Sequence, residues 1–365
     1  MSRSSAFLAP LVLFSGIVGA GVFALPAFLV RAGWLPFSLG LLAVGILMYA
    51  LHGEYLRLTV CYPDKSIGAL ANRFLGKAWG GAGALSVYGG LLLALLVYLI
   101  LGGRFLGILF PSLPSAPLPI LFWVLASLPL LLNMRHRMEL RFVIAGLTIA
   151  LIAFVVSDAW PLQFARMEAV GENPWGVYAG ILFAFGGWAS AEQVGKYLRI
   201  KPGEEARGIR AILWGTFLIG LLYLLFAAAV ASSGSLVTED ALSGLVALPS
   251  LMRKIFALLG ICALWNSYGA VIREFIECTE EDTHIRHAYA TSIAVIAPFA
   301  LLFLGATSLT QAIEIGGGFF GSIQYLVIAM IALRALPQTR FGRAGLWFSS
   351  ALFLLAAIGT SVAWW

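Results

Sequence analysis

Stretches of about 20 apolar residues recur along the whole 365-residue chain, separated by short polar connections. A run of this length is enough to cross the roughly 30 Å hydrocarbon core of a bilayer as an α-helix. Eleven such runs are present, at residues 6–30, 35–60, 79–109, 118–134, 141–158, 175–198, 208–233, 248–272, 288–305, 310–334 and 344–365. The pattern predicts an all-α polytopic membrane protein with about 11 transmembrane helices.

Composition and charge predict how the chain is oriented across the membrane. The chain is 61% hydrophobic and 11% charged, against about 25% charged in soluble domains. If the N-terminus is cytoplasmic, 18 of the 23 Lys and Arg residues fall on the cytoplasmic side, as the positive-inside rule requires. We therefore expect a multi-pass protein of the cell membrane (inner or plasma), with a cytoplasmic N-terminus and Trp365 outside or at the outer interface. The net charge of +6 is then a topology signal, and no nucleic-acid partner is expected.

Glycine interrupts two of the runs near their middles. The first reads "SGIVGAGVFALPAFLVRAGW" at residues 15–34, and the sixth contains "FAFGGWASAEQ" at residues 183–193. Close helix packing through small residues explains either break alone. The first and sixth runs, however, open two sets of five, and interrupted helices at corresponding positions indicate a binding site between inverted repeats. We expect leucine at Gly21 or Gly187 to abolish binding and leave the protein folded.

The two sets define the predicted domain organisation. The chain is one transmembrane transporter domain over residues 1–365, with repeat one at about 6–158, repeat two at about 175–334 and an extra helix at 344–365.

The same segments carry a family resemblance. "GAGVFALPAFLVRAGW" and "FAFGGWASAEQ" resemble the first and sixth helices of the amino acid/polyamine/organocation superfamily. "WNSYGAVIREFIE" and "GGGFFGSIQYLVIAMIALRALP" are similar to the eighth and tenth helices of its hydroxy/aromatic amino acid permease branch, and the amino acid/auxin permease branch is also near. The resemblance implies a 5+5 inverted-repeat, LeuT-like fold with discontinuous helices 1 and 6, and a secondary transporter of amino acids.

A broken helix exposes free N–H and C=O groups that match the carboxylate and ammonium of an amino acid. The resemblance places the carboxylate at the backbone of Gly19, Ala20 and Gly21, and the amine at carbonyls of Ile17 and of the segment from Phe183 to Gly186. The residues expected to surround the substrate are Phe23, Phe183, Phe185, Gly187 and Trp188, with Tyr88 and Tyr98 as further candidates. No acidic residue lies at the breaks themselves, so a neutral, hydrophobic or aromatic amino acid fits best.

The coupling ion has two candidates. Related sodium-coupled families imply a sodium site at the carbonyls of Ser15, Val18 and Ala263 and the side chains of Asn266 and Ser267. Only one hydroxyl is present where two adjacent ones are ideal, and the fifth run lacks the lysine of some proton-coupled relatives. Sodium and proton coupling both stay open at this point.

Ionisable residues within the runs are functional candidates by default. They are His52, Glu54, Glu192, Glu274 and Glu314. Glu314 is the most isolated in sequence and is a candidate proton-sensitive or gating residue. Glu54, Glu192 and Glu274 lie near predicted cytoplasmic ends, where we expect them to pair with Arg57, Lys196 and Arg273.

Two other classes compete with a permease. A membrane amino-acid sensor, such as a spore-germination receptor subunit, shares this superfamily's architecture and binds its ligand without carrying it. An intramembrane enzyme is disfavoured, because no nucleophile motif or metal-ligand spacing is present and the three cysteines fit no metal site. The expected partners are a small-molecule substrate and the lipid bilayer, with no cofactor beyond a possible sodium ion.

Overall fold

The structure is a computed structural model that describes residues 3–131, 138–163, 167–173, 176–233, 237–246 and 248–362. Within these ranges the chain is helical and contains no strand. The elements are α1 (Arg3–Ile17), α2 (Gly21–Ala32), α3 (Trp34–Cys61), α4 (Ile67–Leu75), α5 (Lys77–Leu109), α6 (Leu118–Leu131), α7 (Met138–Asp158), α8 (Val177–Phe185), α9 (Trp188–Leu198), α10 (Glu205–Ser232), η2 (Leu242–Gly244), α11 (Ser250–Thr283), α12 (His287–Phe303), α13 (Leu309–Ile313), the π-helix η3 (Glu314–Gly321), α14 (Ser322–Ala335) and α15 (Arg340–Val362).

Each of the eleven predicted runs coincides with one helix or one interrupted helix. Six helices of the described chain are long and apolar enough to cross a membrane, and the bent pair α1 and α2 makes a seventh span. The remaining four predicted spans correspond to α6, α7, α12 and the pair α8 and α9. The all-α membrane fold is confirmed, whereas the count of eleven spans stays a prediction.

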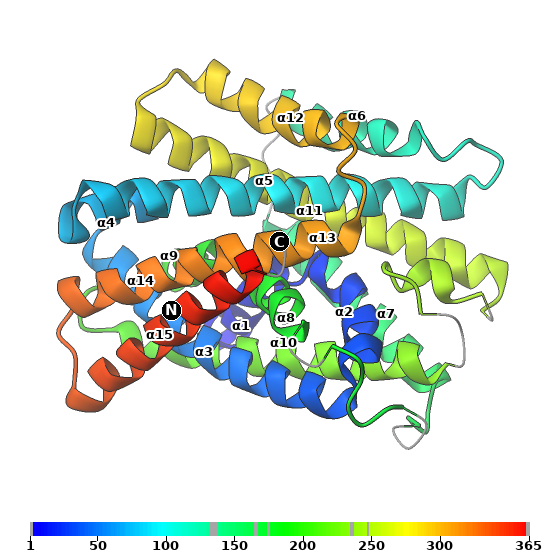
Figure 1. Cartoon of the computed structure of the whole chain (residues 1–365), viewed down its shortest axis with the longest axis horizontal. Coiled ribbons are helices and arrows are strands. Elements are labelled where there is room, and N and C mark those ends of the chain that lie inside the picture. Colours follow the sequence, from blue (N-terminus) through cyan, green and yellow to red (C-terminus); the bar gives the residue numbers. More distant parts are fainter. Residues whose placement is uncertain are drawn as a thin grey trace.

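The long helices run roughly parallel to one axis of the molecule (Figure 1). The interrupted helices lie in the middle, where α1 packs against α9 and α10, and α2 packs against α8. On one side of them α3 packs against α10, and on the other α5 packs against α11. The short α4 lies at one end of the long axis and the loop that carries η2 at the other, so we call these the α4 end and the η2 end.

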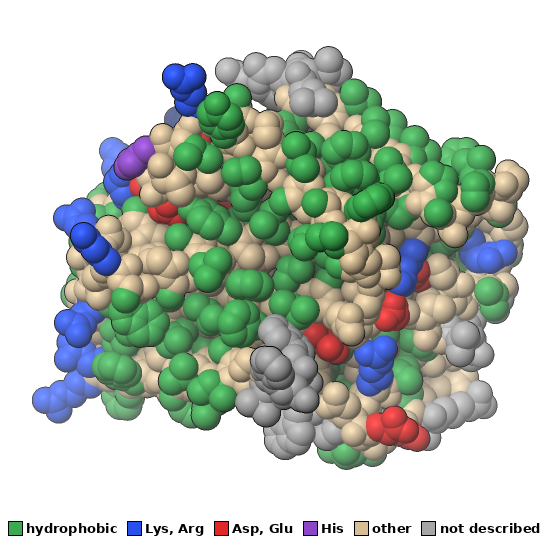
Figure 2. Space-filling view, turned by 45° about the horizontal axis from the view of Figure 1, so that its top comes forward, with side chains coloured by type: hydrophobic (Ala, Val, Ile, Leu, Met, Phe, Trp, Pro, Cys, Tyr) green, Lys and Arg blue, Asp and Glu red, His purple; other side chains and the backbone are tan. Residues whose placement is uncertain are grey.

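Charged and apolar side chains occupy different parts of the surface along the same axis. Figure 2 shows Lys and Arg side chains gathered at the α4 end, with hydrophobic side chains across the middle. Leu42, Trp214 and Phe217 are among the exposed apolar side chains. Such exposure is costly in water and is expected of side chains that face lipid. The protein is therefore a multi-pass membrane protein. Trp365, to which the orientation prediction refers, lies outside the described residues.

Polar contacts hold the α4 end together. The carboxylate of Glu281 on α11 accepts hydrogen bonds from the Ser66 backbone N–H and from Lys65. Asp282 accepts a 2.8 Å hydrogen bond from the Tyr88 hydroxyl. Tyr88, a sequence candidate for substrate contact, thus serves this end of the molecule instead.

Candidate functional site

The first break separates α1 from α2, whose axes differ by 71°. A Cβ atom on Gly21 would lie 2.6 Å from the Cα atom of Ala184, so the backbones of α2 and α8 are in direct contact. A Cβ atom on Gly19 would lie 2.9 Å from the Ser267 hydroxyl on α11. The glycines therefore let three elements converge on the break.

The second break separates α8 from α9 at Gly186 and Gly187. Gly187 has φ +157°, and a Cβ atom there would lie 2.7 Å from Cγ1 of Ile17, the last residue of α1. The second break thus lies against the first. The prediction that helices 1 and 6 are discontinuous is confirmed.

Two buried tyrosines bind the backbone around the second break. The Tyr223 hydroxyl on α10 donates a 2.8 Å hydrogen bond to the carbonyl of Ala184. The backbone N–H of Gly187 donates to the Tyr325 hydroxyl on α14 at 3.3 Å. Backbone groups left free at membrane depth need such partners or a polar cavity.

A cavity of about 130 Å³ adjoins both breaks. Its lining contains backbone or side chains of α1, α2, α5, α8, α9, α11, η3 and α14. The lining residues are Gly16, Ile17, Ala20, Gly21, Gly90, Leu91, Ala94, Tyr98, Leu182, Phe183, Gly186, Gly187, Trp188, Ala189, Ser190, Gln193, Ala270, Val271, Glu274, Gly316, Gly317, Gly321, Gln324 and Tyr325. The cavity is thus mainly apolar, with a few polar groups.

Most of the predicted substrate-binding residues lie at this cavity. They are Ile17, Ala20, Gly21, Phe183, Gly186, Gly187 and Trp188. Gly19 contacts Ser267 and is not among the lining residues.

Two predicted aromatic contacts lie elsewhere. The ring of Phe23 packs edge-on against Phe105, with centroids 5.0 Å apart, and Phe185 packs in the same way against Tyr223 at 5.4 Å. Neighbouring helical positions project in different directions, and these two project into the core. We therefore leave Phe23 and Phe185 out of the proposed site.

The prediction that leucine at Gly21 leaves the protein folded also needs correction. Because its Cα faces the Ala184 backbone, which is not free to swing aside, a bulky residue would separate α2 from α8. Replacement of Gly21 therefore tests folding as well as binding.

Glu274 lines the cavity, although the sequence predicts it near a cytoplasmic helix end, paired with Arg273. Glu54 and Glu192 do form the expected pairs, with Arg57 at 2.9 Å and Lys196 at 2.7 Å. Glu274 instead faces the cavity, and the Cys278 thiol is 3.7 Å from its carboxylate. Ala270, Val271 and Glu274 share one face of α11, but this spacing alone does not tell which face meets the cavity.

The predicted sodium ligands are only partly available. Of the two predicted side-chain ligands, Ser267 shares a hydrogen bond with Tyr98. Oδ1 of Asn266 is buried without a hydrogen-bond partner in the described chain, as a cation ligand would be. Ser15, Val18 and Ala263, the predicted carbonyl ligands, are buried. The described residues contain no cluster of three or more His, Cys, Asp or Glu side chains that fits a metal ion. Sodium coupling stays a prediction.

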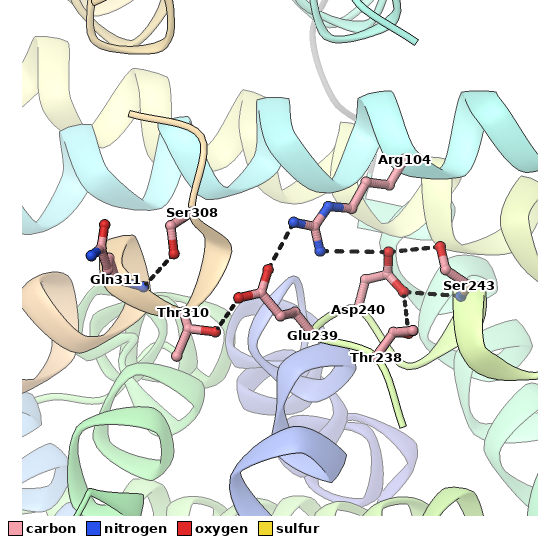
Figure 3. Close-up of polar contacts among 8 residues, drawn as sticks. All are labelled: Arg104, Thr238, Glu239, Asp240, Ser243, Ser308, Thr310 and Gln311. Carbon is pink, nitrogen blue, oxygen red and sulfur yellow. Dashed lines mark hydrogen bonds and ion pairs between the residues drawn. The ribbon is translucent and has the colours of Figure 1, made fainter. Parts of the chain in front are cut away.

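A polar network closes the η2 end (Figure 3). Arg104 on α5 contacts Glu239 at 2.8 Å and Asp240 at 3.7 Å, and Thr310 on α13 donates to Glu239 at 2.7 Å. Burial opposes ionisation of Glu239, but hydrogen bonds from Arg104 and Thr310 and the positive charge of Arg104 hold the pKa of this carboxyl below its usual range. Glu314 lies at the same end, within electrostatic reach of Arg31 and Glu239.

The lining residues are distributed unevenly between the two ends of the molecule. None of the lining residues belongs to the network of Arg104, Glu239 and Asp240. Ser190, Gln193 and Glu274 extend the lining along α9 and α11, whose C-terminal ends lie at the α4 end. The lining therefore extends from the breaks toward the α4 end and does not reach the network at the η2 end.

Comparison with known proteins defines the fold. No family model matches the chain, and no curated protein matches it. Among solved structures, MhsT in complex with L-phenylalanine is 16% identical, with 99% of this chain and 98% of that chain covered and a TM-score of 0.68. The manganese transporter of Eremococcus coleocola is also 16% identical, with 99% and 88% covered and a TM-score of 0.63. Mhp1, a nucleobase-cation-symport-1 family transporter, is 12% identical, with 98% and 93% covered and a TM-score of 0.59.

These similarities place the chain in a structural class. It has the LeuT-like fold that is found in these transporters, including the interrupted first and sixth helices. Identities of this size establish the fold alone, so the predicted superfamily branch stays a prediction.

Proposed function

We propose that the protein is a secondary active transporter that carries neutral, hydrophobic or aromatic amino acids by alternating access, coupled to protons or sodium. The observation that carries this proposal is the meeting of two interrupted helices at one cavity. The first N–H groups of α2 and α9 and the last carbonyls of α1 and α8 lack the partners that a continuous helix would give them. An amino acid supplies a carboxylate and an ammonium to match both.

The lining supports the substrate class. Phe183, Trp188 and Tyr98 give the cavity aromatic walls, and glycine at the breaks lets a ligand approach the backbone. A solved structure of the same fold, MhsT, holds L-phenylalanine. Glu274 is the one carboxylate among the lining residues, and it offers a partner for a substrate ammonium or a proton.

The asymmetry between the two ends supports alternating access. In one state of such a transporter the site is sealed from one side and connected to the other. In this proposal the network of Arg104, Glu239 and Thr310 forms the closed side, and the lining that extends along α9 and α11 toward the α4 end marks the open side. If the α4 end is cytoplasmic, as the basic residues predict, this conformation faces inward.

Uptake into proteoliposomes tests the proposal. Labelled phenylalanine, leucine, serine and lysine are offered with a sodium gradient, with a pH gradient and with neither. We expect phenylalanine or leucine to accumulate with one of the gradients. Binding without uptake would favour the sensor alternative, and neither binding nor uptake of any amino acid would refute the proposal.

Two neighbouring aromatic residues give a matched pair of variants. Phe183→Ala removes a ring from the cavity wall, and we expect KM for phenylalanine to rise by about tenfold, the size of a lost apolar contact. Phe185→Ala removes a ring that packs on Tyr223, so we expect lower thermal stability with the substrate preference unchanged. Equal effects of the two changes on KM would contradict this assignment of the cavity wall.

A further inference from the structure

A histidine and a tyrosine form a buried pair next to the second break. His52 on α3 is fully buried, and its Nε2 atom lies 3.0 Å from the Tyr325 hydroxyl. Tyr325 lines the cavity and also accepts the Gly187 backbone N–H. The pair thus connects an ionisable ring outside the cavity to the start of α9.

Counting donors and acceptors assigns the proton on His52. The Tyr325 oxygen accepts from the N–H of Gly187, and the N–H of Trp188 also bonds to it. A phenolic hydroxyl has one donor hydrogen and about two acceptor positions. With both positions taken, the hydroxyl hydrogen points to Nε2 of His52, and the neutral ring carries its own hydrogen on Nδ1. This Nδ1 is buried and has no hydrogen-bond partner in the described chain.

We propose that His52 is the coupling proton site of the transporter and that Tyr325 transmits its charge state to the cavity. A proton taken from solvent forms an N–H bond at Nε2, which then donates to the Tyr325 oxygen. The tyrosine O–H turns away from His52 and donates to an acceptor oxygen of the substrate. Because the tyrosine oxygen accepts a new hydrogen bond, it releases one backbone N–H of the second break. No other covalent bond of the protein is made or broken, and the same proton returns to solvent when the substrate leaves.

The surroundings of His52 explain why proton and substrate bind together. The helices that pack against α3 are α2, α8, α9, α10 and α14. From them Tyr325 faces the ring directly, Tyr178 bonds to Ser322, and Tyr223 bonds to the Ala184 carbonyl. The nearest acidic groups on α3 and α9, Glu54 and Glu192, are paired with Arg57 and Lys196. The other charged residues of these helices, Arg31, Glu205, Arg207, Arg210 and Arg334, lie near helix ends.

No carboxylate in the described chain is therefore in place to balance a charged His52 ring. A buried charge without a counter-ion is unfavourable. The carboxylate of a bound substrate supplies the missing negative charge, and binding of one favours binding of the other. This inference rests on the proposed transport function, but its first test does not.

The first test is nuclear magnetic resonance of the His52 ring. Replacement of His136, His284 and His287 by Gln leaves one histidine, whose ring nitrogens are labelled with ¹⁵N in the full-length protein. In the neutral ring we expect hydrogen on Nδ1 and an acceptor at Nε2, and in Tyr325→Phe we expect the Nε2 resonance to lose its hydrogen-bond shift. Hydrogen on Nε2 of the neutral ring would overturn the proposal.

The second test is the pH dependence of phenylalanine uptake. If one proton binds with each substrate, apparent affinity rises by about tenfold per unit fall in pH over the coupled range. We expect His52→Gln and Tyr325→Phe to flatten this dependence and the matched control His284→Gln, in a connection between helices, to keep it. A pH profile of His52→Gln equal to that of the parent would overturn the proposal.

The two failures are distinguishable. If the parent protein carries no amino acid, the transport proposal fails, but the first test still decides the hydrogen bonding of the His52 ring. Hydrogen on Nε2 of the neutral ring would then overturn the proposed pairing of His52 with Tyr325 as well, whereas hydrogen on Nδ1 would leave that pairing intact. If His52→Gln does not fold, Tyr325→Phe gives the same pH comparison.

Discussion

The two helix breaks differ in what holds them. The first is set by shape, because Gly21 lies on the Ala184 backbone and Gly19 lies on the Ser267 side chain. The second is held by two tyrosine hydroxyls, because Tyr223 donates to the Ala184 carbonyl and Tyr325 accepts from the Gly187 N–H. Packing contacts change little with pH or ligand, whereas hydroxyl groups exchange partners readily. The comparison indicates that the first break is a fixed support and the second is the responsive part of the site.

Gly21→Ala is expected to have the largest effect. Its new methyl group would meet backbone of α8, which cannot rotate away, and overpacking of this kind costs about 3 kcal/mol. Thermal unfolding of the purified protein in detergent measures the loss. Gly19→Ala is the matched control at the same break, since the nearest atom is the side-chain hydroxyl of Ser267 and not backbone, and we expect a loss of about 1 kcal/mol or less. If Gly19→Ala is the more damaging change, the first break is not fixed by contact with α8.

Gly187→Ala comes next. The substitution combines an unfavourable φ of +157° with a contact of 2.7 Å to Ile17, and we expect a loss of about 2 kcal/mol. Gly203→Ala separates the two causes, because Gly203 has φ +93° and no atom within 4 Å of the added methyl group. Its loss should be about 1 kcal/mol, from backbone strain alone. Equal losses in the two variants would show that the second break is not crowded by α1.

The two tyrosines are expected to have intermediate effects. Tyr223→Phe and Tyr325→Phe each remove a buried hydroxyl that binds the backbone of the second break, at a cost of about 1–2 kcal/mol. Hydrogen exchange of the backbone at residues 184–190 should rise in both, whereas exchange at residues 17–21 should not. Loosening of the first break by the same amount would contradict the separation of the two.

The smallest effects are expected where the broken helices end. The first interrupted helix ends with α2, where Arg31 lies near Glu239. The second ends with α9, where Lys196 pairs with Asp64 at 3.4 Å. Since the pKa of Glu239 is held below its ordinary value of about 4.5, its network stabilises the protein above that pH and is lost as pH falls through the lowered pKa. We expect Glu239→Gln to lower stability at pH 7 by about 1 kcal/mol and to remove that acid dependence.

Asp64→Asn is the control for this change. The Asp64 side chain is 82% exposed, so we expect no measurable loss of stability. Thermal unfolding of both variants at pH 7 and at pH 3.5 checks the pair. An equal acid sensitivity of the parent protein and Glu239→Gln would remove Glu239 from the closure of the η2 end.

The sequence by itself determined the class of fold and the place of the breaks. Long apolar runs leave few alternatives to membrane helices, since the backbone must satisfy its own hydrogen bonds in lipid. Glycine destabilises a helix relative to alanine, so it is conspicuous in such a run. The positions concerned are Gly19, Gly21, Gly186 and Gly187. These are local properties of the chain, and they appear in the structure where the pattern predicts them.

Only the tertiary structure decided which side chains meet at the cavity. Phe183 lines it and Phe185 does not, although both lie at the same break. Glu274 faces it from α11, and Tyr325 joins His52 across 273 positions of sequence. These outcomes depend on how each helix is rotated about its axis. Packing against several distant helices sets that rotation, and an apolar run that is hydrophobic on every face carries no signal of it.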